Sequence, residues 1–164
     1  PMRRGSSGSP VAESLTTAEL SAWRGFLRAH ARIAGELDAQ LREEHGLSLS
    51  SYEVLMLLGE TPGGRMRISE LSDATLLSMS GASRLVDRLV RAGLVAKEAC
   101  AEDGRGAQAR LTDAGRERLA PARATHLAGV REVFLSRLDP DDLYALARAW
   151  ERVNGAPEVD SGAG

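Results

Sequence analysis

The chain has 164 residues, of which 43% are apolar and 27% are charged, and its formal net charge is −2. These values are ordinary for a globular protein with one core, and no apolar run approaches the roughly 20 residues of a membrane span. A single cysteine, Cys100, excludes an internal disulfide, so we expect a cytoplasmic protein in a reducing compartment, with no membrane partner.

The first predicted helix runs from about residue 17 to residue 45. Thr16 and Glu19 have the spacing of a capping box, and Gly46 is a stop signal. Apolar residues keep a three-four spacing along its whole length. Because nearly 30 residues is long for so small a domain, we expect part of this apolar stripe to face a second subunit. Packing on the chain's own C-terminal helices is the alternative, and the two are compatible.

Two shorter helices follow. Ser50 and Glu53 have the spacing of a second capping box and predict a helix that ends at Leu58. A short extended piece over 65–67 leads to a third helix from Ile68 to about Leu76. The residues expected to face the core from these two helices are Tyr52, Leu55, Met56, Leu58, Leu71 and Ala74.

Ser78 predicts the start of the next helix, residues 79–92, and Gly93 predicts its end. Leu85, Val86 and Leu89 fall on one face, while Arg84, Arg88 and Arg91 recur on another. Two short helices joined by a tight turn form a helix-turn-helix, and a cationic stripe on the second suits a DNA groove.

A predicted wing follows this helix. It consists of a strand over about 95–100, a charged glycine turn over 102–106, and a second strand that ends before Thr112. Arg105 lies at the tip of the turn, where a cation can reach phosphates or a minor groove. Residues 65–118 carry ten basic and eight acidic side chains, so this segment is +2 and the remainder is −4.

Thr112 is the predicted cap of a helix that continues to Leu138, with a kink at Pro121. Asp139 and Pro140 predict the start of a final helix, which Asn154 and Gly155 end. Its apolar stripe is expected to contain Leu143, Leu146, Trp150 and Val153. Residues 1–13 and 156–164 are predicted to be disordered tails of a single domain over 14–155.

Three blocks of residues, in this order and spacing, resemble the MarR family of winged-helix transcriptional regulators over about residues 16–153. The first block is Ile68-Ser69-Glu70-Leu71, and the second runs from Ser83-Arg84-Leu85-Val86-Asp87-Arg88 to Gly93-Leu94-Val95. The third is Asp103-Gly104-Arg105-Gly106-Ala107 followed by Leu111-Thr112-Asp113-Ala114-Gly115.

The resemblance implies a mostly α fold with a small β wing. It implies a winged helix-turn-helix over about 48–112 and a homodimer built from helices over about 16–45 and 113–153. Such a dimer presents two recognition helices to the major grooves of a pseudo-palindromic duplex, with half-sites roughly 10 base pairs apart. Most members repress transcription and release DNA when a small phenolic or lipophilic ligand binds.

The residues expected to contact DNA lie at the start of the recognition helix, one turn further along it, and at the wing tip. Arg84 is the expected base reader, with a phosphate or an intramolecular carboxylate as the alternative partner. Arg88 is expected on phosphate, with a wing carboxylate as its alternative. The full set is Ser78, Ser80, Gly81, Ser83, Arg84, Arg88 and Arg105.

By the same resemblance, Asp103 orients an arginine such as Arg105 or Arg110 through charge-assisted hydrogen bonds. Cys100 is either a small strand residue or an oxidation-sensitive one. Candidates for lining a ligand pocket, for which core packing or dimer contact is an equal explanation, are Trp23, Phe26, Leu27, His30, Tyr52 and Met56.

The chain has no nucleophile elbow, phosphate loop, metal-ligand spacing or Cys/His pair, so we expect no enzymatic activity, no metal and no cofactor. The alternative function is a winged-helix module that binds other proteins and has no specific DNA target. Arg84, Arg88 and Arg105 discriminate between these two functions, because only a DNA-binding protein needs their charge.

Overall fold

The computed structural model describes residues 14–99 and 106–155. The chain divides into two compact units, residues 1–32 and residues 33–164. Helix α1 (Thr17–His45) passes through both. Its start is confirmed, because the Thr16 backbone N–H donates to Glu19 Oε2 at 2.7 Å and the Glu19 N–H donates to Thr16 Oγ1 at 3.2 Å. Gly46, with a φ of 65°, follows its end.

Helix α2 (Leu49–Glu60) begins earlier than its sequence predicts, because Ser48 and not Ser50 is its cap. The Ser51 N–H donates to Ser48 Oγ at 3.1 Å, and the Leu49 N–H donates to Oδ1 of Asp38 on α1 at 2.8 Å. A carboxylate from another helix thus satisfies the first free donor of α2. A short 3-10 turn, η1 (Pro62–Gly64), follows.

Helix α3 (Ile68–Ala74) and helix α4 (Met79–Arg91) form the predicted helix-turn-helix. Ile68 and Leu71 are buried, but Ala74 is exposed, so its expected inward position was wrong. Helix α3 also ends before Leu76 and not at it. The start of α4 is as predicted, since the Gly81 N–H donates to Ser78 Oγ at 3.1 Å.

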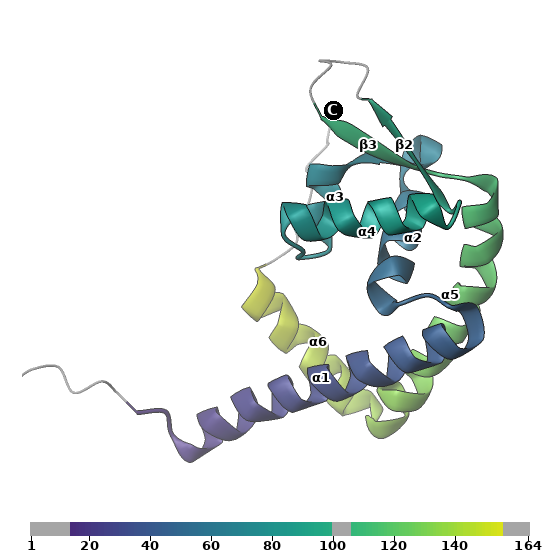
Figure 1. The fold of residues 1–164 in the computed structure, drawn as a ribbon. Coiled ribbons are helices and arrows are strands. Elements are labelled where there is room, and N and C mark those ends of the chain that lie inside the picture. Colours follow the sequence, from purple (N-terminus) through teal and green to yellow (C-terminus); the bar gives the residue numbers. More distant parts are fainter. Residues whose placement is uncertain (1–13, 100–105, 156–164) are drawn as a thin grey trace, which may run out of the picture. The chain divides into compact units, whose positions relative to one another are not determined.

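Three short strands form one antiparallel sheet in the order β1-β3-β2. They are β1 (Arg65–Arg67), β2 (Val95–Ala99) and β3 (Ala107–Leu111). Figure 1 shows α4 running below the β2 and β3 hairpin. The register places Arg110 opposite Arg65 on one side and opposite Ala96 on the other.

Helix α5 (Asp113–Val133) starts at the predicted cap, where the Gly115 N–H donates to Thr112 Oγ1 at 3.0 Å. It stays helical through Pro121, but it stops at Val133, and a 3-10 turn, η2 (Leu135–Arg137), separates it from Leu138. Figure 1 shows that α5 bends along its length. Helix α6 (Pro140–Asn154) is capped by Asp139 as predicted.

The core lies between α2, α3, α4, the sheet and the adjoining ends of α1 and α5. Leu85, Val86 and Leu89 of α4 are buried as predicted, as are Tyr52, Leu55 and Leu58 of α2. Met56 is partly buried and packs against this cluster. Helix α6 contributes no buried residue in the single chain. The core therefore fixes the position of the recognition helix, whereas Leu143 and Val153 of the α6 apolar stripe are exposed and Leu146 and Trp150 are partly exposed.

Candidate nucleic-acid interface

Helix α4 has one buried face and one exposed cationic face. Ala82, Leu85, Val86 and Leu89 pack into the core at three-four spacing, and this packing fixes the helix about its own axis. Residues Ser80, Arg84, Arg88 and Arg91 are exposed, and Gly81 and Ser83 are partly exposed. The structure thus brings six of the seven predicted contact residues, counting Ser78, to one helix.

The first turn of α4 combines small polar groups with free helix N–H groups. Ser78 Oγ caps Gly81 N–H and lies 3.2 Å from Ser80 Oγ. Ser78 is therefore occupied as a cap, although its side chain remains exposed. The positive end of the helix dipole and the absence of bulky polar groups suit close approach to an anionic surface.

Arg84, Arg88 and Arg91 make no ion pair with any residue in 14–99 or 106–155. An intramolecular carboxylate partner for Arg84, which was one alternative, is therefore not found within those ranges. Unpaired guanidinium groups on an exposed helix keep their full donor capacity for phosphates or guanine edges.

One negative charge interrupts this cationic face. Asp87 Oδ1 accepts from Nζ of Lys97 on β2 at 3.0 Å, and both side chains are partly exposed. The pair ties the recognition helix to the wing strand. Sequence reasoning did not assign Lys97 a role, because nothing in the sequence shows which side of α4 faces β2.

Glu98 on β2 sits between two arginines from neighbouring strands. Its Oε1 accepts from Arg110 Nε at 2.6 Å, and its Oε2 lies 3.6 Å from Arg65 Nε. The hydrogen bond from Arg110 lowers the pKa of Glu98 below its ordinary value. Arg65 and Arg110 stand directly opposite each other on β1 and β3, so this carboxylate offsets a like-charge pair.

The predicted wing-tip contact Arg105, its expected partner Asp103, and Cys100 lie outside the described residues. The expected orientation of Arg110 by Asp103 is therefore still a prediction, alongside the observed bond from Arg110 to Glu98.

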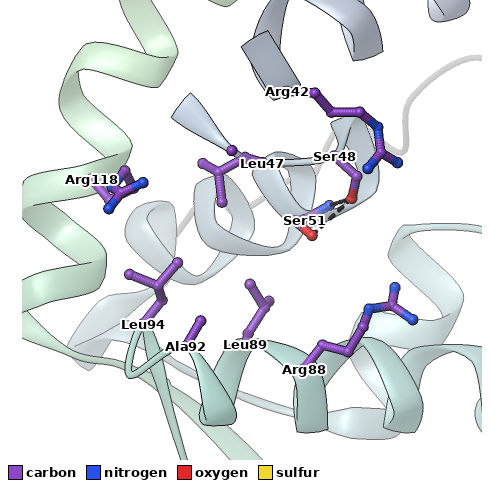
Figure 2. Close-up of a pocket in the computed structure, with 10 residues that line it drawn as sticks. Arg42, Leu47, Ser48, Ser51, Arg88, Leu89, Ala92, Leu94 and Arg118 are labelled. Carbon is purple, nitrogen blue, oxygen red and sulfur yellow. Dashed lines mark hydrogen bonds between the residues drawn. The ribbon is translucent and has the colours of Figure 1, made fainter. Parts of the chain in front are cut away.

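A half-open pocket of about 600 Å³ lies between the end of α1, the start of α2, the second half of α4 and α5. Figure 2 shows Arg42 and Arg88 on one side of it and Arg118 on the other, with Leu47, Leu89 and Leu94 between them. Arg118 also donates to the His45 carbonyl at 2.7 Å, and Arg42 Nε to Asp38 Oδ2 at 2.6 Å. The pocket is thus a leucine floor with a guanidinium rim.

None of the six residues predicted to line a ligand pocket lines this one. Trp23, Phe26 and His30 follow one another along the exposed first part of α1, with ring centroids 5.9 Å and 6.2 Å apart. Leu27 is exposed there as well. Tyr52 is buried against the His126 ring at 4.5 Å, and Met56 packs against the core. Their proposed ligand role stays a prediction.

The residues with a role in this site that sequence reasoning missed are Arg42, Lys97, Glu98 and Arg118. Lys97, Glu98 and Arg118 bond to residues at least ten positions away, so no local spacing marks them. Arg42 pairs with Asp38 four residues before it, but its place at the pocket depends on the fold. Among the described residues, no group of three His, Cys, Asp or Glu side chains is arranged to hold a metal ion. No described helix is both long enough and apolar enough to span a bilayer.

Comparisons with known proteins agree with this geometry. A family model described as the MarR family matches residues 45–106. The HTH-type transcriptional repressor IacR of Pseudomonas putida is 30% identical over 115 residues, which cover 70% of this chain and 67% of IacR.

Two solved structures from Streptomyces coelicolor have the same fold. AbsC, a MarR family transcriptional regulator, is 36% identical with a TM-score of 0.81, and the match covers 87% of this chain and 96% of AbsC. Sco3205, another MarR family transcriptional regulator, was solved in complex with DNA; it is 33% identical with a TM-score of 0.81, and the match covers 93% of this chain and 96% of Sco3205. The sequence and the fold of this chain together show that it belongs to the MarR family of transcriptional regulators.

Proposed function

We propose that the chain is a dimeric, cytoplasmic, sequence-specific DNA-binding repressor. The observation that carries this proposal is the exposed face of α4, where Ser80, Arg84 and Arg91 are held outward by a fully buried opposite face. A helix of 13 residues with such a face fits the major groove, which admits an α-helix and presents a distinct donor and acceptor pattern for each base pair. The related Sco3205 was solved on DNA.

Within this proposal the residues of α4 have different tasks. Arg84, close to the start of the helix, reads base edges together with Ser80, Gly81 and Ser83, because the amino end of a recognition helix faces the bases. Arg88, one turn later, contacts phosphate. Arg105 is assigned to the minor groove at the wing tip.

Exposed apolar residues support the dimer. In the first unit, Leu15, Trp23 and Leu27 are 56%, 54% and 45% exposed, and in the second unit Tyr144 and Val153 of α6 are 66% and 71% exposed. Stripes of this kind on two terminal helices are unfavourable in water unless a second copy covers them. Two copies would place their recognition helices on half-sites about 10 base pairs apart.

The test is a titration of the purified protein with duplex DNA from upstream of its own gene, at two salt concentrations, with an unrelated duplex as control. We expect a clear preference for the upstream duplex and an affinity that falls steeply with salt, since bound arginines displace counterions. Binding with neither preference nor salt dependence would favour the protein-interaction module. Arg84→Ala should relax base preference, whereas Arg105→Ala should weaken binding to all sequences.

We further propose that a small organic anion releases the protein from DNA by binding the pocket of Figure 2. The leucine floor suits an apolar body, and the Arg42, Arg88 and Arg118 rim suits a carboxylate. Arg88 belongs both to this rim and to the proposed phosphate contacts. A ligand that holds Arg88 therefore competes with DNA.

Benzoate is the probe, and uncharged benzyl alcohol is its matched control. Benzoate should raise the melting temperature of the free protein and weaken DNA binding, while benzyl alcohol should do neither. Arg42→Gln should reduce the benzoate effect and leave DNA affinity in the absence of benzoate unchanged, because Arg42 lies off the recognition helix. If benzoate releases DNA equally from the Arg42→Gln variant, the pocket assignment is wrong.

A further inference from the structure

The turn between α3 and α4 presents a leucine in an unusual way. Leu76 is 94% exposed and has a φ of 56°, which makes it the one residue other than glycine with positive φ among those described. Single exposed leucines are common, but a leucine in the left-handed region is not, because its Cβ crowds the backbone there. Neither the buried core nor the local backbone preference accounts for a leucine at this position.

The backbone around Leu76 is held rigidly. The Leu77 N–H donates to the Ser72 carbonyl at 3.2 Å, and the Leu76 N–H lies 3.5 Å from the Asp73 carbonyl, which is the bond pattern that ends a helix in a left-handed residue. The buried Ser72 side chain closes the turn by donating to the Leu77 carbonyl at 2.7 Å. The Leu76 side chain therefore leaves the protein from a fixed backbone and is not part of a loose loop.

A second apolar side chain lies close by in the chain. Met79, the first residue of α4, is 53% exposed. The residues beside it, Ser78 and Ser80, are small and hydrogen bonded to each other. Leu76 and Met79 are thus two exposed apolar residues three positions apart, just before and at the amino end of the recognition helix, where the proposed base readers also lie. These two residues are the apolar pair.

We propose that the apolar pair reads thymine by packing against its C5-methyl group in the major groove. This inference rests on the proposed function and deepens it by assigning base specificity. The thymine methyl is the apolar feature that the major groove offers to a protein, and apolar side chains are its ordinary partners. The amino end of a recognition helix lies against base edges, so the pair is placed to reach it. Continuity with the cationic face of α4 argues for DNA as the partner, because a protein partner would not need the exposed arginines of that face, which make no ion pair within the described residues.

The experiment replaces thymine by deoxyuridine, which removes the methyl group and keeps Watson–Crick pairing. A duplex is first selected from a random library with the purified full chain, and each thymine of one half-site is then replaced in turn. We expect one or two replacements to weaken binding about three- to fivefold each, which corresponds to the burial of one methyl group. The other replacements should have no effect.

Variants of the chain identify the residue responsible. Leu76→Asn keeps a residue that tolerates positive φ, and Met79→Ala keeps the helix, so both should fold normally. Each variant should lose the discrimination at the thymine that its substituted residue contacts, so that thymine and deoxyuridine at that position are bound equally well. Val90→Thr, which alters an exposed apolar residue near the other end of α4, is the matched control and should keep the discrimination.

Leu76→Gly separates a structural role from a recognition role. Glycine relieves the strain of positive φ, so the melting temperature should stay unchanged or rise while the thymine preference is lost. Insensitivity of the wild-type protein to every deoxyuridine replacement, or unchanged discrimination in folded Leu76→Asn and Met79→Ala, overturns the inference and leaves DNA binding intact. Failure to select any duplex overturns the proposed function, and the inference with it.

Discussion

Gly115 offers a sharp test of how the wing is joined to α5. It is buried in the first turn of α5, where a Cβ built on it would lie 2.2 Å from the Leu94 carbonyl oxygen and 2.7 Å from Leu111 Cδ1. The oxygen belongs to backbone, and it accepts a hydrogen bond from the Thr112 N–H at 3.1 Å. Gly115→Ala therefore pushes Leu94, which lies just before β2, away from the first turn of α5.

The expected change in the free energy of unfolding of Gly115→Ala is the sum of two destabilising effects and one stabilising effect. Overpacking costs about 1–3 kcal/mol, and loss of the Thr112 hydrogen bond costs about 1 kcal/mol. Alanine in place of glycine stabilises a helix by about 1 kcal/mol. Because the overlap is with a backbone atom, we expect the upper end of the overpacking range. The net effect should be a loss of about 2–3 kcal/mol of unfolding free energy, or roughly 5–10 °C in melting temperature.

Thermal and urea unfolding, followed by circular dichroism, measure this effect. Gly35→Ala is the matched control, because it makes the same change in a helix where, apart from the adjacent helix backbone, no atom lies within 4 Å of the new Cβ. That variant should be more stable than wild type by up to about 1 kcal/mol. If Gly115→Ala unfolds at or above the wild-type temperature while Gly35→Ala is stabilised, the packing described between Leu94 and α5 is wrong.

Three further predictions concern charge and capping. Asp87→Asn removes the negative charge paired with Lys97, so DNA affinity should rise, and the logarithmic salt slope should steepen by about one unit if the freed lysine contacts phosphate. Burial lowers the pKa of His126, so between that lowered pKa and about pH 6.5 the unfolded chain binds more protons than the folded chain. Stability should therefore fall as the pH drops from about 6.5 toward the lowered pKa, and His126→Phe should flatten this fall in urea unfolding. Ser78→Ala removes the α4 cap and should cost about 1 kcal/mol in the same assay, while a Ser78→Asp variant should recover most of it.

The sequence predicts helix α4 well because its determinants are local. Ser78 as the cap, Gly93 with a φ of 73° just beyond the end, and three-four spacing of leucine and valine all lie within the helix or next to it. The same holds for the caps Thr112 and Asp139. Where one turn of sequence contains both partners of an interaction, spacing alone is enough to identify them.

Partners that are distant in sequence could not be predicted in this way. Two serines, Ser48 and Ser50, both have the character of a cap for α2, and the choice of Ser48 accompanies a bond between Asp38 of α1 and the Leu49 N–H. Arg110 likewise bonds Glu98 because of the β2–β3 register, which fixes which side chains share a face of the sheet. Apolar spacing shows that a residue is buried, but it does not show against what.

Leu76 marks a place where the observed end of α3 differs from its predicted end for a local reason. The sequence predicts that α3 extends to Leu76 because leucine favours a helix and the usual stop signal, glycine, is missing there. The structure ends α3 at Ala74 with the bond pattern that normally contains glycine, and it places leucine in the left-handed position. That conformation costs of order 1 kcal/mol relative to glycine, and the exposed side chain makes no core contact that offsets the cost. A residue whose conformational preference conflicts with its backbone, and whose side chain does not pack in the core, is expected at a functional site, where a bound partner contacts that side chain. The thymine methyl group is the contact we assign to it.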